Sequence, residues 1–551
     1  MVNCIWRREE VRFEYPKRRK ASAYAQRSVV MAKRGMVASS HVLASQSGLK
    51  VLLRGGNAVD AAVAMLFTLS VVEPHSVGLG GDGFALIWNA KDRVLMGLNG
   101  SGRAPLASNI EWFKERGMNT IPERGILSVT VPGALRAWAD ALEECGTMTL
   151  SQVMEDAIVY AEEGFPVTEI IAGEWESARE ILGRDEEGAR VFLPGGRPPR
   201  PGEVFRNPDL ARTLKILEKE GVGSFYEGPI GEAIVAASKK RGGLISMEDL
   251  KSHKSTWVDP ISTIYRGYEV WELPPNGQGI VALEMLNILE GYHLAELEHN
   301  GPEHVHLLVE AKKAAFEDRD TLLGDPLFGP VAIEAMVSRE RAADIRSRIS
   351  MKKASPPSFL QPSIPGSDTV YVCAVDGEGN AASFISSIFM HFGSGVVVEG
   401  TGLVLQNRGH AFRLEPSHPN SLLPGKRPLH TIIPAMLFKD GNFIMSFGVM
   451  GGDMQPQGHV QFLVNVIDFG MNLQEALDSP RVRHLQGMRV YLEDGIPERT
   501  RSALQAMGHE VEEGEPQVNQ VGGGQAIHRD PETGVLLGAS DRRKDGCAIG
   551  F

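Results

Sequence analysis

The sequence predicts an α+β protein with a layered αββα arrangement of helices and strands. Strand-like apolar runs concentrate in the last third of the chain, where 369–375 and 381–388 flank turn residues and indicate a hairpin. Long helical patterns dominate the first two thirds. A strand-rich part that stacks on helices is typical of a layered fold.

The first part of the chain begins with a basic leader, residues 1–34. It is either an arm for an anionic surface or a solvated segment or strand that lies on the fold. Residues 54–57 close a first helix, Glu73 and Pro74 end a second, and proline begins a third. The elements expected here are strands at 36–40 and 84–98 and helices at 43–53, 58–72, 132–145, 150–163, 208–220 and 230–241.

Later elements include a helix start with Ser246 as its candidate cap. The proline-rich stretch 351–367 is interpreted as a linker, or as a tail that ends at a processing site. The remaining expected elements are strands at 265–273, 395–399, 402–407, 435–438 and 443–447 and helices at 279–289, 302–320 and from Gly451–Gly452 through 469.

Composition favours a soluble enzyme that acts on small molecules. The chain has 551 residues and a formal net charge of -12, which argues against a general nucleic-acid binder. Its 4 cysteines are scattered without a C-x-x-C pair, and the longest uncharged apolar run, 61–72, is too short to span a bilayer. The start of the chain lacks the apolar core of a secretory signal. We therefore expect a cytoplasmic protein with no nucleic-acid or membrane partner.

Two features bear on a site. The glycine cluster at 78–83 lacks Gly-Lys-Ser/Thr and precedes a strand, so it indicates tight backbone packing near a site and not a phosphate loop. Thr369 lies at the very start of the predicted hairpin. If the chain is cut immediately before Thr369, that residue carries a free α-amine beside its own hydroxyl, so one residue supplies both nucleophile and base.

From about Gly35 to Gly550 the chain resembles the γ-glutamyltranspeptidase family of N-terminal-nucleophile hydrolases. The matching segments are, in chain order, Gly55–Ala62, Glu73–Pro74, Gly78–Gly81, Ser128–Gly133, Tyr265–Tyr268, Leu323–Pro326, Asp368–Thr369, Phe392–Gly395, Lys426–Pro428, Gly451–Gly452 and Gly538–Asp541. The resemblance implies a four-layer αββα sandwich and self-cleavage between Asp368 and Thr369. The resulting large subunit, 35–368, and small subunit, 369–551, would remain associated, and a dimer of processed units is possible.

The resemblance also implies catalytic roles, with hydrolysis through an acyl-threonine ester on Thr369. Ser387 matches the family's second hydroxyl, and Gly451 and Gly452 match its oxyanion site. Without the resemblance, Ser387 would read as a solvent-facing serine and the glycine pair as a plain turn. No cofactor is implied. The spacing of His391, His410, His430 and His459 matches no common metal-ligand motif, so we expect no metal.

Departures from the family pattern bear on the substrate. Ser101 stands at the family's substrate arginine, for which Arg103 can substitute, while Phe389, Arg408 and Ala411 replace an asparagine, a glutamine and the amine-binding aspartate. His430 and Thr431 replace paired serines, and the lid segment 412–425 is short. The predicted substrate contacts are Arg103, Asn407, Arg408, His430 and Thr431. Arg103 and Arg408 can equally be read as surface or packing arginines.

These changes weaken the ammonium contact and keep the anion contacts. We therefore expect an amidohydrolase that acts on an acyl group with a carboxylate and no free α-amine, as in the amidohydrolase and acylase branch that the chain resembles. One alternative is γ-glutamyl transfer or glutathione hydrolysis. Another is an unprocessed, non-catalytic binding protein on the same fold.

Overall fold

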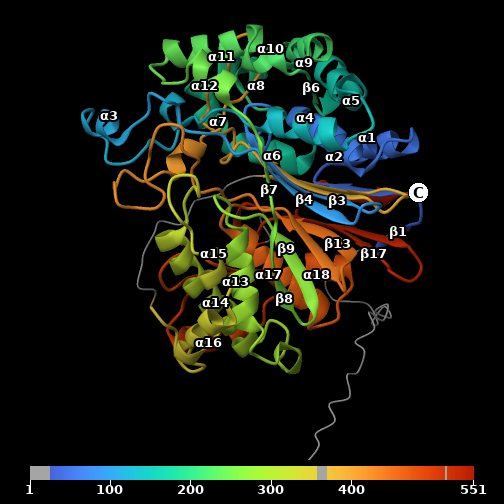
Figure 1. Cartoon of the computed structure of the whole chain (residues 1–551), viewed down its shortest axis with the longest axis vertical. Helices are drawn as coiled ribbons and strands as arrows, with labels where there is room; N and C mark the ends of the chain where they lie inside the picture. Colours follow the sequence, from blue (N-terminus) through green and yellow to red (C-terminus); the bar gives the residue numbers. More distant parts are fainter. Residues whose placement is uncertain (1–24, 26, 357–368, 516–517) are drawn as a thin grey trace, which may run out of the picture.

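Two β-sheets, each built from strands that are far apart in the sequence, form the middle of the molecule (Figure 1). The computed structural model describes residues 25, 27–356, 369–515 and 518–551. Each sheet has seven strands. The first has the order β19 (Cys547–Gly550), β2 (Met36–Ser39), β10 (Val370–Val375), β11 (Ala381–Ser387), β3 (Asp82–Asn89), β4 (Val94–Asn99) and β7 (Thr256–Val258). The second has the order β1 (Val30–Ala32), β18 (Leu536–Ser540), β17 (Gly524–Arg529), β13 (Asn442–Val449), β12 (Ala435–Lys439), β9 (Tyr268–Glu272) and β8 (Ile261–Tyr265).

The strand β10 shows why the sheets stack. Its alternate residues Val370, Val372 and Ala374 belong to the apolar cluster beneath the first helix layer. Tyr371 and Cys373 point the other way, into a cluster shared with the second sheet. Because successive side chains of a strand point to opposite faces, an apolar strand of this kind must be covered on both sides.

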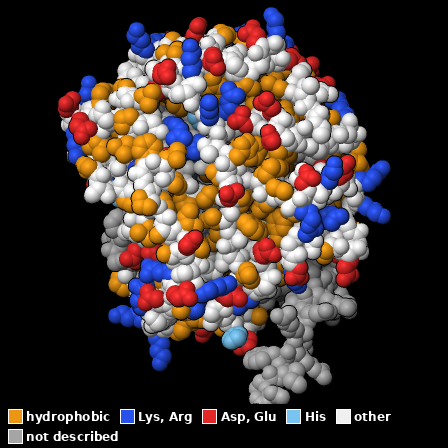
Figure 2. Space-filling model, viewed as in Figure 1, with side chains coloured by type: hydrophobic (Ala, Val, Ile, Leu, Met, Phe, Trp, Pro, Cys, Tyr) orange, Lys and Arg blue, Asp and Glu red, His pale blue; other side chains and the backbone are white. Residues whose placement is uncertain are grey.

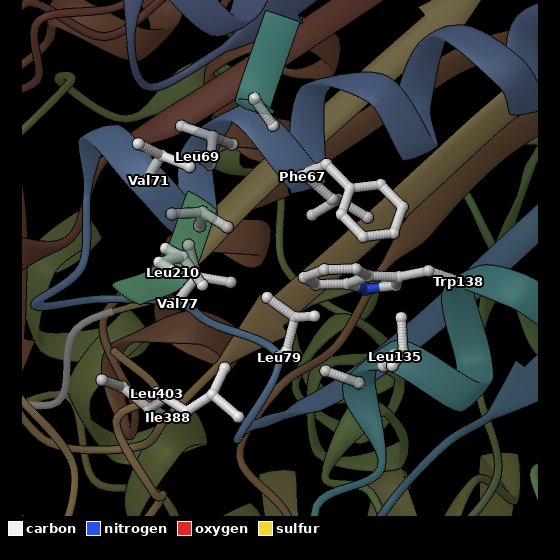
Figure 3. Packing of buried hydrophobic residues seen from close by; sticks show 14 of the residues in the cluster. Phe67, Leu69, Val71, Val77, Leu79, Leu135, Trp138, Leu210, Ile388 and Leu403 are labelled. Carbon is white, nitrogen blue, oxygen red and sulfur yellow. The ribbon is translucent and has the colours of Figure 1, made fainter. Parts of the chain in front are cut away.

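The first helix layer covers the outer face of the first sheet (Figure 1). At its centre, α2 (Ala58–Val72) is buried along its whole length, and a capping box of Asn57 and Asp60 begins it. Figure 3 shows the Phe67 ring against Trp138, with ring centroids 5.2 Å apart. The other long helices are α1 (Val42–Leu53), α4 (Ala134–Cys145), α5 (Leu150–Glu163), α9 (Pro208–Glu220) and α11 (Pro229–Lys240).

The second helix layer covers the outer face of the second sheet, where another apolar cluster lies. It contains α13 (Gly279–Leu289), α14 (Pro302–Leu322), α17 (Met454–Ile467) and α18 (Leu473–Asp478). The four layers confirm the predicted αββα sandwich. None of the helices in the described ranges is both long and apolar enough to cross a membrane. Figure 2 shows basic and acidic side chains interspersed over one face.

Most predicted elements agree with the structure, and Ser246 caps a helix (Met247–Ser252) as expected. The strand expected at 265–273 is confirmed as β9 from Tyr268, but its start is wrong, because Arg266 and Gly267, both with positive φ, turn the chain between β8 and β9. The strands expected at 395–399 and 402–407 are also wrong. An isolated bridge between Val397 and Val404 is their one β contact in the described chain, because glycines with positive φ at 400 and 402 bend it.

The basic leader and the predicted cleavage segment are described only in part. The leader includes β1, an edge strand that pairs with β18. Residues 1–24 and 357–368 lie outside the described residues, and with them Asp368.

Each sheet contains strands from before and from after residue 369, so the expected large and small subunits share both sheets. One buried ion pair also joins them. Glu73, at the end of α2, lies 3.4 Å from the Lys544 ammonium and accepts a hydrogen bond of 2.5 Å from the Ser40 hydroxyl. Both ionic side chains are fully buried.

Replacing Lys544 with Met should therefore destabilise the protein by about 3–5 kcal/mol, because it leaves the Glu73 carboxylate buried without its cation. Lys240→Met is the control, since Lys240 pairs with Glu399 at the surface and its loss should change stability little. Denaturant unfolding of the two variants measures the difference. Equal stability of both would contradict a structural role for the buried pair.

Candidate functional site

The β10–β11 hairpin brings two hydroxyls together at one end of the first sheet. Its antiparallel register pairs Val370 with Ser386, so the next residues outward, Thr369 and Ser387, lie opposite each other. Thr369 Oγ1 donates to Ser387 Oγ over 3.3 Å, and Ser387 Oγ also accepts from the N–H of Phe389 at 2.8 Å. Both hydroxyl residues are fully buried. The predicted nucleophile and second hydroxyl are thus in contact.

Asp82 extends this row onto the neighbouring strand, because β3 pairs it with Ser387. Its carboxylate accepts hydrogen bonds from His430 Nε2 at 3.0 Å, from the Gly102 N–H at 2.8 Å and from Gln406 Nε2 at 3.0 Å. Sequence reasoning did not select Asp82. The available signal was its position at the end of the glycine cluster and the start of a strand.

The glycine cluster itself confirms the prediction of tight packing. A Cβ atom at Gly81 would lie 2.5 Å from the carbonyl oxygen of Ser387, and one at Gly80 would lie 2.1 Å from that of Val404. Only glycine allows this approach of the backbone to the end of β11. Ile388, which directly follows β11, belongs with Leu403 to the apolar cluster drawn in Figure 3.

His430 is a neutral hydrogen-bonding residue of the site. Its Nε2–H faces Asp82, while its Nδ1 accepts from the N–H of Ile432 at 3.3 Å. Burial, followed by the nearby Arg408 charge, lowers the pKa of His430 to about 4. The imidazole therefore stays uncharged at neutral pH, with its proton on Nε2.

Arg408 is a fully buried cation of the site with few hydrogen-bond acceptors around it. Its guanidinium lies 3.9 Å above the ring centre of Phe389, and its Nη1 donates to Thr431 Oγ1 at 2.8 Å. Burial lowers its pKa to about 9, so the group remains charged at neutral pH. Its Nε and Nη2 are buried without a partner among the described residues. A buried donor without an acceptor is costly, so the geometry suits an anion supplied by a ligand.

Gly451 and Gly452 form the turn that leads into α17. Their φ angles are 114° and 58°, which favour glycine. Within the described chain, neither of their N–H groups donates a hydrogen bond, whereas their carbonyls accept from the N–H groups of Met454 and Gln455. Two such donors at a helix start suit a developing oxyanion. The predicted role fits this geometry.

Two further predicted residues make mainly structural contacts. Arg103 donates to the carbonyl of Gly425 at 3.1 Å and lies 3.8 Å from Asp325. The first contact joins the lid segment to the loop that follows β4. The Asn407 amide accepts from the N–H of Met390 at 3.1 Å and donates to the carbonyl of Glu123 at 2.8 Å. Asn407 is therefore positioned to hold the loop that carries Arg408.

The four histidines considered for metal binding lie apart, each with its own partner. These partners are Glu174 for His391, the carbonyl of Ile121 for His410, Asp82 for His430 and Glu272 for His459. Another group, His306, Glu310 and His509, has ligand atoms within 4.8 Å of one another.

This second group is already occupied by internal contacts. His306 and His509 hydrogen-bond to each other at 2.9 Å, and His306 also bonds to the carbonyl of Ser350 at 2.8 Å. Lys313 pairs with Glu310 at 2.7 Å. The lysine charge beside the carboxylate opposes a cation, so these side chains anchor residues 350–355 and do not fit a metal site.

Comparison with known proteins shows the family of this chain. The family model of gamma-glutamyltranspeptidase matches residues 44–551. A glutathione hydrolase-like YwrD proenzyme of Bacillus subtilis is 39% identical over 95% of this chain and 99% of its own length. An oxamate amidohydrolase proenzyme of Klebsiella pneumoniae is 37% identical, over 94% of this chain and 98% of its own. The crystal structure of a cephalosporin acylase from Bacillus halodurans has a TM-score of 0.90 and 44% identity, covering 97% of this chain and 99% of that one.

The neutral state of His430 predicts a pH dependence of stability. Because its folded pKa of about 4 is below the unfolded value, His430 contributes stability that is present above about pH 6.5 and lost as the pH falls towards 4. His430→Phe removes this linkage. The free energy of unfolding of wild type minus that of the variant should therefore fall by up to about 3 kcal/mol between pH 6.5 and 4. Urea unfolding across this range tests it, and a constant difference would contradict it.

Proposed function

The chain belongs to the γ-glutamyltranspeptidase family and is a self-processing amidohydrolase, and we propose that Thr369 is its nucleophile and that its acyl substrate carries a carboxylate. The observation that supports this most is the contact of Thr369 with Ser387 two residues before Phe389, whose ring carries the buried Arg408. A reactive hydroxyl and an unsatisfied cation thus lie at the same end of one strand.

Processing begins with attack of Thr369 Oγ1 on the carbonyl carbon of Asp368. Collapse of the tetrahedral intermediate breaks the peptide C–N bond and leaves an ester on the threonine oxygen, with the amine taking up the proton. Water then hydrolyses the ester, which gives a carboxylate at Asp368 and a free amine at Thr369. Ser387 Oγ, 3.3 Å from Thr369 Oγ1, orients the attacking hydroxyl.

The same hydroxyl then acts on the substrate. The Thr369 amine, whose class titrates near pH 8, takes the proton from Oγ1 as that oxygen attacks the amide carbon. The oxyanion accepts hydrogen bonds from the N–H groups of Gly451 and Gly452. The amine passes its proton to the leaving nitrogen, and an acyl-threonine ester remains. Water, deprotonated by the amine, releases the acid and regenerates Oγ1.

The preference for a carboxylate rests on the charges that surround the site. Two donor nitrogens of Arg408 have no partner among the described residues, and its planar group suits a carboxylate. Arg427 is buried nearby and bonds to carbonyl oxygens, including that of Ser101 at 3.1 Å. The position at which the family has its amine-binding aspartate is occupied by Ala411. The name of the oxamate amidohydrolase supports the same class of substrate for this chain, because oxamate is an amide with a carboxylate.

A second candidate function is γ-glutamyl hydrolysis or transfer, which the name of the YwrD relative favours. It requires a contact for an α-ammonium group. Comparing γ-glutamyl anilide with glutaryl anilide, which lacks that group, separates the two functions. Turnover of the first substrate without the second would support the alternative.

Thr369→Ala should abolish both cleavage and hydrolysis, because the methyl group supplies neither a nucleophile nor a proton donor. Thr369→Ser should retain part of each. Denaturing electrophoresis and release of aniline from glutaryl anilide measure the two outcomes, with Thr321→Ala as a control for an exposed threonine hydroxyl. A single uncut chain in active wild-type protein would refute the proposed nucleophile.

Arg408→Met should lower kcat/KM for glutaryl anilide by about 10- to 100-fold, the usual effect of losing a hydrogen bond to a charged group. Hydrolysis of butyryl anilide, which has no carboxylate, should change little. The control is Arg266→Met, which removes an arginine that bonds to Asp468 and to backbone carbonyls in the second helix layer. An equal loss on both substrates would mean that Arg408 serves packing and not recognition.

A further inference from the structure

Gln278 lies beneath the candidate site, directly before α13, and is fully buried. Its Nε2 donates to two carbonyl oxygens, that of Thr431 at 2.8 Å and that of Gly452 at 3.0 Å. Thr431 is the residue that holds Arg408, and Gly452 belongs to the turn assigned to the oxyanion. One amide group therefore joins the two halves of the site.

We infer that Gln278 is a positioning residue that fixes the oxyanion turn at a set distance from the carboxylate contact. This inference rests on the proposed function of Thr369 and Arg408. Gln278 touches no reacting atom, and its effect is exerted through the backbone of Gly452 and Thr431.

The orientation of the Gln278 amide is determined by its neighbour. Its Oε1 accepts from Arg319 Nη1 at 2.9 Å, and arginine can only donate. Arg319 is itself buried and paired with Asp320 and Asp453, each within 2.7 Å. With the oxygen of Gln278 held in this way, both N–H groups of Nε2 face the two carbonyls.

The oxyanion turn needs such support because glycine gives its backbone wide freedom. The N–H of Met454 holds the carbonyl of Gly451, and Gln278 together with the N–H of Gln455 holds that of Gly452. The peptide groups on either side of Gly452 are thereby fixed, which aims its N–H before the reaction begins. Donors arranged in advance stabilise the developing charge without reorganisation.

On the other side, Gln278 holds the carbonyl of Thr431, whose hydroxyl accepts from Arg408. A substrate whose carboxylate binds Arg408 must present its amide carbonyl to the glycine turn. Loss of the shared amide would let these two contacts drift apart, and a displacement of this kind slows reaction more than it weakens binding.

The experiment is Gln278→Met, which keeps the length of the side chain and removes all its hydrogen bonds. We expect kcat for glutaryl anilide to fall about 10- to 100-fold, with KM changing less than threefold. The kcat of Gln278→Glu should fall at least as far, because its carboxylate would face two carbonyl oxygens. This variant would still pair with Arg319. Both variants should still appear as two chains on denaturing gels.

Gln461→Met is the matched control. Gln461 also donates through Nε2 to two carbonyls, those of Gln457 and Val482, and accepts from one N–H, but it lies further along α17. It should lose stability to a similar extent and keep the wild-type kcat. Equal kcat losses in Gln278→Met and Gln461→Met would overturn the inference, because they would reveal only a packing effect.

The outcome also separates this inference from the proposed function. If wild-type protein shows no pre-steady-state burst and no cleavage, the function of Thr369 fails and the role of Gln278 fails with it. If wild type shows both and Gln278→Met matches wild type in kcat, only the inference about Gln278 fails.

Discussion

The register of the β10–β11 hairpin is the constraint on which the site depends. It sets Thr369 opposite Ser387. The pairing of β11 with β3 then sets Ser387 opposite Asp82, so the three residues form one row across the sheet. A shift of one residue would turn every side chain of β10 to the other face of the sheet. Thr369 would then point towards the helix layer, away from the face that it shares with Tyr371. Burial of both faces of this strand makes such a shift costly, so packing and chemistry enforce the same register.

The charges around this row are expensive to bury, and their arrangement shows what each one does. Asp82 receives three hydrogen bonds from His430, Gly102 and Gln406, which offset the loss of water. Arg408 packs on the Phe389 ring and donates to the Thr431 hydroxyl, and in the part of the chain that the structure describes its Nε and Nη2 have no acceptor. A structural arginine of this burial would normally be given more acceptors. The imbalance is explained if the missing acceptor arrives with the substrate, and it is compatible with stability because the surrounding layers contribute large apolar cores.

Sequence reasoning located the parts of this protein that local patterns control. The predicted bounds of α2, α5, α9 and α13 agree with the structure, and the hairpin followed from two apolar runs around a turn. It failed at 395–407, where branched residues suggested strands but glycines with positive φ bent the chain. It also missed Asp82 and Gln278, whose roles come from contacts with residues 348 and 153 positions away. No local pattern carries such information. The family resemblance supplied Ser387 and the glycine pair, which composition alone would have left as ordinary surface or turn residues.

The arrangement of the sheets also links the candidate site to both sides of the proposed cleavage point. Thr369 meets Ser387 through the pairing of β10 with β11, while β3, which brings Asp82, comes from before that point. The carbonyls of Gly452 and Thr431 are held only when Gln278, from before that point, is in place. If Thr369 is the nucleophile, as proposed, its surroundings are complete only in a chain that has folded before it is cut. After the proposed cleavage, the two parts would still share both sheets and the buried pair of Glu73 and Lys544.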